Sequence, residues 1–210
     1  MKLVCISDTH GKHESVTVPD GDVLVHAGDS TNMGYEFEIE RFLRWYGAMP
    51  HEHKILIAGN HDWCFENNPT LYANMCASHC VIYLQDQATI IDGVKFYGSP
   101  WQPEFCGWAF NLERGPALAG CWAEIPDDTQ VLITHGPRWG ALDLLYHGER
   151  VGCADLAKRI ETLTLKAHVF GHVHCCYGRV KDELRGTELI NASICNEAYE
   201  PVNAPIVIEI

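Results

Sequence analysis

Five short motifs along the chain combine aspartate, histidine and asparagine, whose oxygen and nitrogen atoms bind divalent metal ions. They are Asp8-Thr9-His10, Gly28-Asp29, Gly59-Asn60-His61-Asp62, His135-Gly136 and Gly171-His172-Val173-His174. A donor set of imidazole, carboxylate and amide groups without thiolate favours manganese, iron or zinc. One such motif alone is common in unrelated proteins, but five in one chain indicate a metal centre.

The spacing within the motifs suggests how they share ions. Asp8 and His10 are two positions apart, so in an extended segment both side chains point the same way and can bind one ion. His172 and His174 have the same spacing, and we expect them to serve different ions only if their loop splays the two rings. A carboxylate has two oxygens, so Asp29 can bridge two cations.

The elements that precede these motifs must position them. Short runs rich in Val and Ile predict buried strands over residues 2–7, 22–27, 54–58, 130–134 and 167–170, each of which ends at a motif. In an α/β fold, the loops after strand C-termini lie at one edge of a sheet. Ligands that are far apart in sequence are therefore expected to converge there.

The remaining segments complete an α/β pattern. Amphipathic stretches predict helices, an Asp92-Gly93 dipeptide predicts a hairpin turn, and two late apolar runs predict closing strands. The helices are expected over 35–49, 67–79 and 152–163, the hairpin over 88–97, an irregular aromatic loop over 100–115, and the strands over 188–192 and 206–210.

Length, composition and charge limit the possible functions. The chain has 210 residues, an ordinary globular composition and no low-complexity linker, so we expect one domain over residues 1–210. Its formal charge of −13 disfavours long nucleic acids and anionic membranes as partners. We find neither a signal peptide nor a membrane span, and expect a cytoplasmic protein whose ten cysteines are mostly buried free thiols. The sequence leaves the oligomeric state open.

Taken in order, the five motifs resemble the signature of the calcineurin-like metallophosphoesterases, and the resemblance covers nearly the whole chain. Longer blocks at 134–137, 169–174 and 190–193 resemble the metallophosphoesterase-domain branch of that family. The resemblance implies an α/β fold of the four-layer type, in which α-helices flank a sandwich of two mixed β-sheets with a binuclear metal site at one sheet edge. It implies the ligands as well: Asp8, His10 and His174 for the first ion, Asn60, His135 and His172 for the second, and Asp29 as the bridge.

A hydrolytic mechanism follows as a hypothesis. Two cations about 3.5–4 Å apart can share a hydroxide that attacks phosphorus in line. His61, next to the ligand Asn60, is placed to give the leaving oxygen a proton. Asp62 either orients His61 or is an ordinary loop carboxylate, and both interpretations remain open.

Two further residues are candidates for contacts with the substrate. Arg138 follows a ligand loop and could bind phosphate oxygens in a bidentate manner. The alternative is a solvated surface arginine, which we prefer. Trp63 directly follows the third motif and could border the pocket and stack on a ring, although packing is the usual role of such aromatic side chains.

The expected function is a metal-dependent phosphoesterase acting on a small phosphorylated substrate. The resemblance, and the absence of the Asp-Arg-Gly extension found in protein Ser/Thr phosphatases, favour a phosphodiesterase for cyclic-nucleotide-like substrates over a phosphoprotein phosphatase. A phosphomonoesterase or a nuclease for short nucleic acids is the enzymatic alternative. A metal-binding scaffold without activity is the alternative from a different class.

Overall fold

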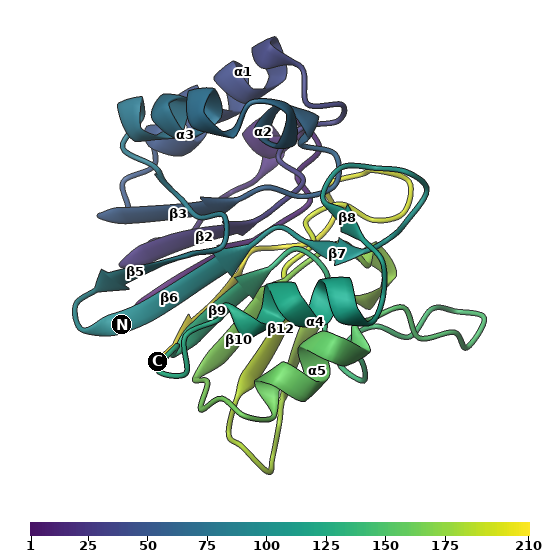
Figure 1. Ribbon diagram of the computed structural model, residues 1–210. Coiled ribbons are helices and arrows are strands. Elements are labelled where there is room, and N and C mark those ends of the chain that lie inside the picture. The colour runs from purple at the N-terminus through teal and green to yellow at the C-terminus, as the bar shows by residue number, and fades with distance from the viewer.

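The computed structural model describes residues 1–210. Two large mixed β-sheets pack face to face, and helices cover both outer faces (Figure 1). Helices α1 (Glu36–Gly47), α2 (Trp63–Asn67) and α3 (Pro69–Ser78) cover sheet 1, and α4 (Pro116–Ala123) and α5 (Ala154–Ile160) cover sheet 2. The sandwich of two mixed sheets implied by the family resemblance is confirmed.

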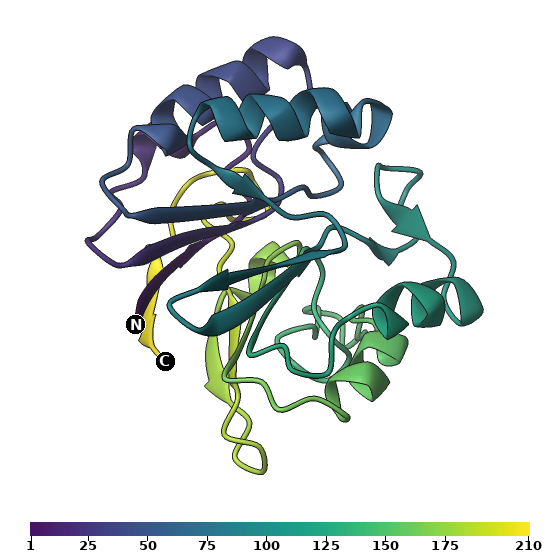
Figure 2. The ribbon, with the colours of Figure 1, turned by 60° about the vertical axis from the view of Figure 1, so that its left-hand side comes forward.

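Sheet 1 has the strand order β13-β1-β2-β3-β4. Its strands are β1 (Lys2–Ile6), β2 (Val23–Ala27), β3 (His53–Ile57), β4 (Ile82–Tyr83) and β13 (Ile206–Glu209). Strands β1 to β4 are parallel, whereas β13 runs antiparallel to β1 and pairs Glu209 with Lys2. This pairing brings the two chain ends side by side (Figure 2).

Sheet 2 has the strand order β11-β12-β10-β9-β6-β5. Its strands are β5 (Gln87–Ile91), β6 (Val94–Ser99), β9 (Val131–Thr134), β10 (Ala167–Phe170), β11 (Gly178–Lys181) and β12 (Glu188–Asn191). The four inner strands are parallel and the two edge strands are antiparallel. The chain also forms two short strands, β7 (Gln102–Pro103) and β8 (Asn111–Leu112), and two 3-10 turns, η1 (His13–Ser15) and η2 (His174–Cys176).

Successive side chains of a strand point to opposite faces of the sheet, so apolar residues form a core on each side of each sheet. In β1, Leu3 and Cys5 point into the core between the sheets, where they join Ile133 and Val169 of sheet 2. Val4, between them, points the other way, into the core beneath α1 and α3. A third core lies between sheet 2 and the helices α4 and α5. A strand that is buried on both faces has a continuous run of apolar residues in its sequence. These strands could be predicted for that reason.

Most predicted strands match within one or two residues, and the hairpin turns at Asp92-Gly93 as expected, with φ 47° and 77°. The helix predicted over 67–79 is instead the end of α2 followed by α3. Pro69 lacks an N–H and forces the preceding residue, Asn68, out of the helical conformation to a φ of −147°. The helix is therefore interrupted at Asn68. Helix α4 and the strands β4, β7, β8 and β11 were not predicted. None of the helices has the length and apolarity needed to cross a membrane.

Candidate metal centre

The five motifs follow the C-terminal ends of β1, β2, β3, β9 and β10 with at most one residue between strand and motif, as predicted. The side chains that they carry converge at one edge of the sandwich, into three groups whose ligand atoms lie within 4.8 Å of one another. The groups are Asp8, His10 and His174; His10, Asp29 and His61; and Asp29, His135 and His172. Sheet 1 therefore contributes the earlier donors and sheet 2 the later ones.

The first group joins the two sheets. The Nε2 atom of His174 lies 3.2 Å from Nε2 of His10 and 3.3 Å from Oδ1 of Asp8. Asp8 and His10 are buried, and His174 is nearly so. Two imidazole nitrogens and a carboxylate oxygen thus meet at one point, which is the donor set predicted for the first ion.

The donors predicted for the second ion are centred on Asn60, which joins His135 and His172 of the third group. Its Oδ1 lies 3.0 Å from Nε2 of His135 and 2.9 Å from Nδ1 of His172. Asp29 lies between the two groups, because its Oδ2 is 3.3 Å from Nε2 of His135 and 3.7 Å from Nε2 of His10. This position suits the bridging role implied by the family resemblance.

Backbone carbonyls fix the tautomers of two of these histidines. Nδ1 of His135 donates to the carbonyl of Ala27 at 2.9 Å, and Nδ1 of His174 donates to the carbonyl of Asn196 at 2.9 Å. A carbonyl only accepts, so each Nδ1 carries the proton. In the neutral ring the lone pair is then on Nε2, which faces the other donors, as in rings that bind a metal.

The charges at this edge are compatible with a cation. Asp8 and Asp29 are buried, and their only ion-pair partners are histidines. Burial raises the pKa of both carboxyls, but the hydrogen bonds and charges of His174 and His135 outweigh it and hold each pKa below its usual range. Buried carboxylates need compensating positive charge, which a divalent ion can supply.

Burial also lowers the pKa of His135, but the charge of Asp29 and a hydrogen bond to it outweigh that effect and raise the pKa to about 9. Metal ions bind the neutral ring. A cation must therefore displace the proton that Asp29 stabilises on His135, so cation and proton compete for the same position.

The backbone around the ligands is not extended, contrary to our expectation for Asp8 and His10. Asp8, His10, Asp29 and His172 all have a left-handed backbone, with φ of 52°, 41°, 56° and 65°. Such conformations are costly for residues other than glycine and occur preferentially at functional sites. The turn at His172 also splays its ring from that of His174, so that His172 faces Asn60 and His174 faces Asp8.

Two glycines of the motifs allow this close approach. A Cβ atom at Gly171 would overlap the carboxylate of Asp8 and the hydroxyl of Ser7. A Cβ at Gly59 would overlap Asp29 and the ring of His135. No larger residue fits at either position without moving a donor.

His61 lies beside the first group. Its Nδ1 donates to the carbonyl of Asn32 at 2.6 Å, which leaves Nε2 for another partner. The ring stacks on Trp108 with centroids 4.2 Å apart and lies edge-on to His10 at 4.7 Å. Packing and one hydrogen bond therefore hold His61 in place.

The hydrogen bonds of Asp62 favour the loop-carboxylate interpretation over direct orientation of the His61 ring. Its carboxylate is fully buried and accepts from both the N–H and the hydroxyl of Ser30, from the same two groups of Thr31, and from the amide of Gly59. None of these partners is the imidazole, which Asn32 binds instead. Asp62 ties together the loops that carry Asp29 and Asn60.

The two candidates for substrate contacts lie elsewhere. Arg138 pairs with Asp182 at 3.4 Å and does not line the cavity at the metal centre. Trp63 packs against the core beneath α1. The tryptophan that stacks on His61 is instead Trp108, from the segment 100–115 that was predicted only as an irregular aromatic loop.

A cavity of about 280 Å³ opens at the donors. Apart from the candidate ligands and His61, its lining includes apolar side chains and one acidic side chain but no Lys or Arg. These other lining residues are Phe105, Leu145, Val151, Val173, Cys175, Glu197 and Tyr199.

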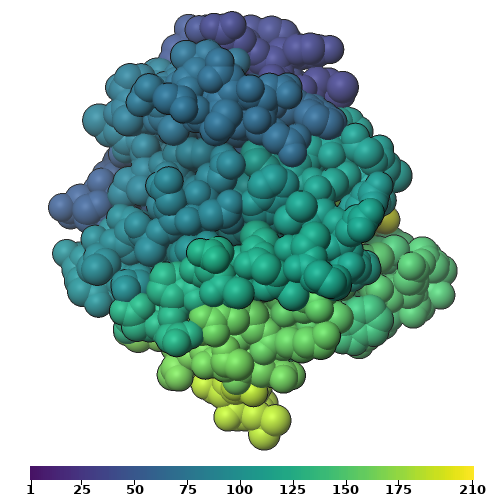
Figure 3. All heavy atoms as spheres, in the orientation of Figure 1, coloured from purple at the N-terminus to yellow at the C-terminus, as the bar shows by residue number.

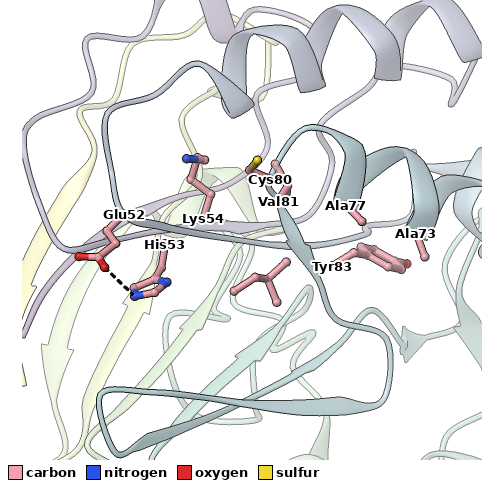
Figure 4. A pocket seen from close by; sticks show the side chains of 9 residues that line it. Glu52, His53, Lys54, Ala73, Ala77, Cys80, Val81 and Tyr83 are labelled. Carbon is pink, nitrogen blue, oxygen red and sulfur yellow. Dashed lines mark ion pairs between the residues drawn. The ribbon is translucent and has the colours of Figure 1, made fainter.

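A separate hollow of about 500 Å³ lies between α3 and the strands β3 and β4 (Figure 4). It contains a Glu52–His53 ion pair at 4.0 Å. No group of converging metal-binding side chains lines it. The chemistry therefore belongs to the smaller cavity.

Comparison with known proteins agrees with this geometry. The family described as calcineurin-like phosphoesterase matches residues 1–176. The whole chain is 42% identical to 71% of human metallophosphoesterase domain-containing protein 1. Likewise, 99% of the chain is 42% identical to 74% of the Caenorhabditis elegans UPF0046 protein K07C11.7. The crystal structure of TT1561 from Thermus thermophilus superposes with a TM-score of 0.62 at 14% identity, over 90% of this chain and 88% of the other.

Proposed function

The chain belongs to the calcineurin-like metallophosphoesterase family and is thus a metal-dependent phosphoesterase, and we propose that it is a phosphodiesterase for small substrates such as cyclic-nucleotide-like diesters. The proposal concerns the class of ester, the number of ions and the residues that act.

The charge of the cavity is the observation that carries the preference for diesters. None of its twelve lining residues is Lys or Arg, and Glu197 adds a carboxylate to the lining. A phosphate diester carries one negative charge, whereas a monoester carries nearly two at neutral pH, since its second pKa is about 6. A cavity without cationic side chains binds the single charge at lower cost, and its apolar residues can contact a second ester group.

We assign the ion-holding role to seven residues. Asp8, His10 and His174 would hold one divalent ion, Asn60, His135 and His172 a second, and Asp29 both. Such ions acidify water and neutralise phosphate oxygens, and manganese is our first choice for the assay.

The chain's own residues complete the reaction. His61, held by Asn32 and Trp108, would donate a proton to the leaving oxygen from Nε2. Asp62 would act through the loops that it binds rather than on the substrate.

The test compares bis(4-nitrophenyl) phosphate with 4-nitrophenyl phosphate in the presence of manganese. We expect hydrolysis of the diester, its loss in Asp29→Ala and its retention in the exposed control Asp20→Ala. Activity on the monoester alone would assign the protein to phosphomonoesterases. No bound metal and no hydrolysis with manganese, iron or zinc would favour the scaffold.

A further inference from the structure

A projecting hairpin forms one side of the cavity mouth. Residues 143–151 leave the body of the molecule on the right in Figure 3, and Tyr146 near the tip is 81% exposed. At the base, buried Asp143 pairs with Arg150 and accepts from the amides of Gly140 and Gly152. The hairpin is thus anchored by its base.

Apolar side chains of this hairpin face the cavity. Leu145 and Val151 line it together with Phe105, which comes from the separate 100–115 segment. Phe105 lies edge-on to the His172 ring with centroids 5.5 Å apart and is 49% exposed. An aromatic side chain left half-exposed beside a metal ligand adds little to the core and is available to a ligand. We refer to Phe105, Leu145 and Val151 as the apolar wall.

The opposite side of the cavity has a different character. Tyr199 lies edge-on to His10 with centroids 4.7 Å apart and lines the cavity there. His61, the proposed proton donor, also contacts His10. The leaving group, which receives the proton, therefore belongs on the His10 side. The ester group that remains on phosphorus then belongs on the His172 side, where Phe105 of the apolar wall lies edge-on to the His172 ring.

We propose that Phe105, Leu145 and Val151 form the subsite for the retained ester group and that it prefers a flat, apolar group of about one aromatic ring. This assignment rests on the proposed phosphodiesterase function. The apolar wall then determines which diesters are preferred, and its three residues lie outside the five metal-binding motifs.

Two substrates with the same leaving group isolate this subsite: phenyl 4-nitrophenyl phosphate and methyl 4-nitrophenyl phosphate. We expect wild-type kcat/KM to be at least roughly tenfold higher for the phenyl ester, since contacts in an apolar pocket discriminate on that scale. In Phe105→Ala/Leu145→Ala, that preference should fall to within about twofold, because kcat/KM falls far more for the phenyl ester than for the methyl ester. Inhibition by diphenyl phosphate should weaken in parallel.

Leu144→Ala is the matched control, because Leu144 is on the same hairpin, is 48% exposed and does not line the cavity. Metal content and melting temperature should be unchanged in both variants. Equal wild-type activity on the two esters, or an equal loss on both in the double variant, would overturn the subsite. Failure of the wild type to hydrolyse either diester would instead overturn the phosphodiesterase proposal.

Discussion

The Nε2 atoms of His10 and His174 lie 3.2 Å apart although 164 positions separate the two residues in the chain. His10 follows β1 of sheet 1, and His174 lies in the loop after β10 of sheet 2. Because Nδ1 of His174 donates to Asn196, its Nε2 offers a lone pair to this contact. At this edge of the sandwich the two sheets therefore meet through a pair of candidate metal-binding groups.

Removing divalent ions should lower the melting temperature. The buried carboxylates of Asp8 and Asp29 would lose the positive charge that compensates them. A ligand present at 100 times its Kd stabilises the folded state by about 2.7 kcal/mol, which corresponds to roughly 5–10 °C for a chain of this size. Calorimetry with and without chelator measures the shift, and adding manganese should reverse it. An unchanged melting temperature after proven metal loss would argue against these ligands.

Gly171→Ala should impair metal binding. The added methyl group would overlap the carboxylate of Asp8, which must then move away from His174. We expect metal affinity to fall by at least about tenfold, as when groups that orient ligands are disturbed. Titration of the apoprotein with manganese measures the affinity. Gly120→Ala in α4 is the control, because its Cβ would meet open space and should leave affinity intact.

His61→Ala should discriminate between leaving groups. Without a proton donor, an ester with a poor alkoxide leaving group should slow by about 10²–10⁴-fold, whereas a nitrophenolate leaves unaided and should slow far less. Rates on the two classes of diester, measured at equal metal loading, test this role. Equal losses on both classes would remove His61 as the proton donor.

Asp62→Ala should destabilise the fold. Five donors from Ser30, Thr31 and Gly59 would lose their buried acceptor, which costs about 3 kcal/mol or more of the free energy of unfolding. Urea denaturation measures the loss, and Asp62→Asn should lose less because it keeps one acceptor oxygen. The exposed Asp127→Ala serves as the surface control. A loss of activity without a loss of stability would instead point to direct contact with substrate.

Stability should fall on mild acidification, in part through His168. Burial, aided by the charge of Arg138, lowers the pKa of this histidine from 6.5 to about 3. Above pH 6.5 the ring is neutral in both states; below it, the unfolded chain takes up a proton that the folded chain does not. Between pH 7 and pH 5, wild type should lose about 2 kcal/mol more than His168→Gln. Parallel denaturation curves for the two proteins would contradict this.

The sequence was sufficient to predict that the motif side chains converge at one edge, because each motif is a local pattern. Each motif follows a run of apolar residues, and parallel strands bring their C-terminal ends to one edge. The position of Asp29 between two donor groups agrees with the bridging role, which we predicted from the order of the motifs through the family resemblance.

The contacts of the remaining candidates depend on residues distant in sequence. Arg138 pairs with Asp182, 44 positions away, and His61 is held by the carbonyl of Asn32, a group that every residue has. Trp63 is adjacent to His61 in sequence, yet Trp108 is the ring that stacks on it. The left-handed φ of Asp8 and Asp29 likewise follows from how the loops close, which no local pattern encodes.

The division of donors between two sheets couples the metal centre to the interior. Asp8, His10, Asp29 and Asn60 extend from sheet 1, and His135, His172 and His174 from sheet 2, so their mutual distances depend on how the apolar faces dock. A substitution such as Ile133→Ala, within that interface, would shift one half of the centre relative to the other. The affinity for ions should therefore depend on how the two sheets pack against each other. A core substitution that contacts no candidate ligand should still weaken metal binding.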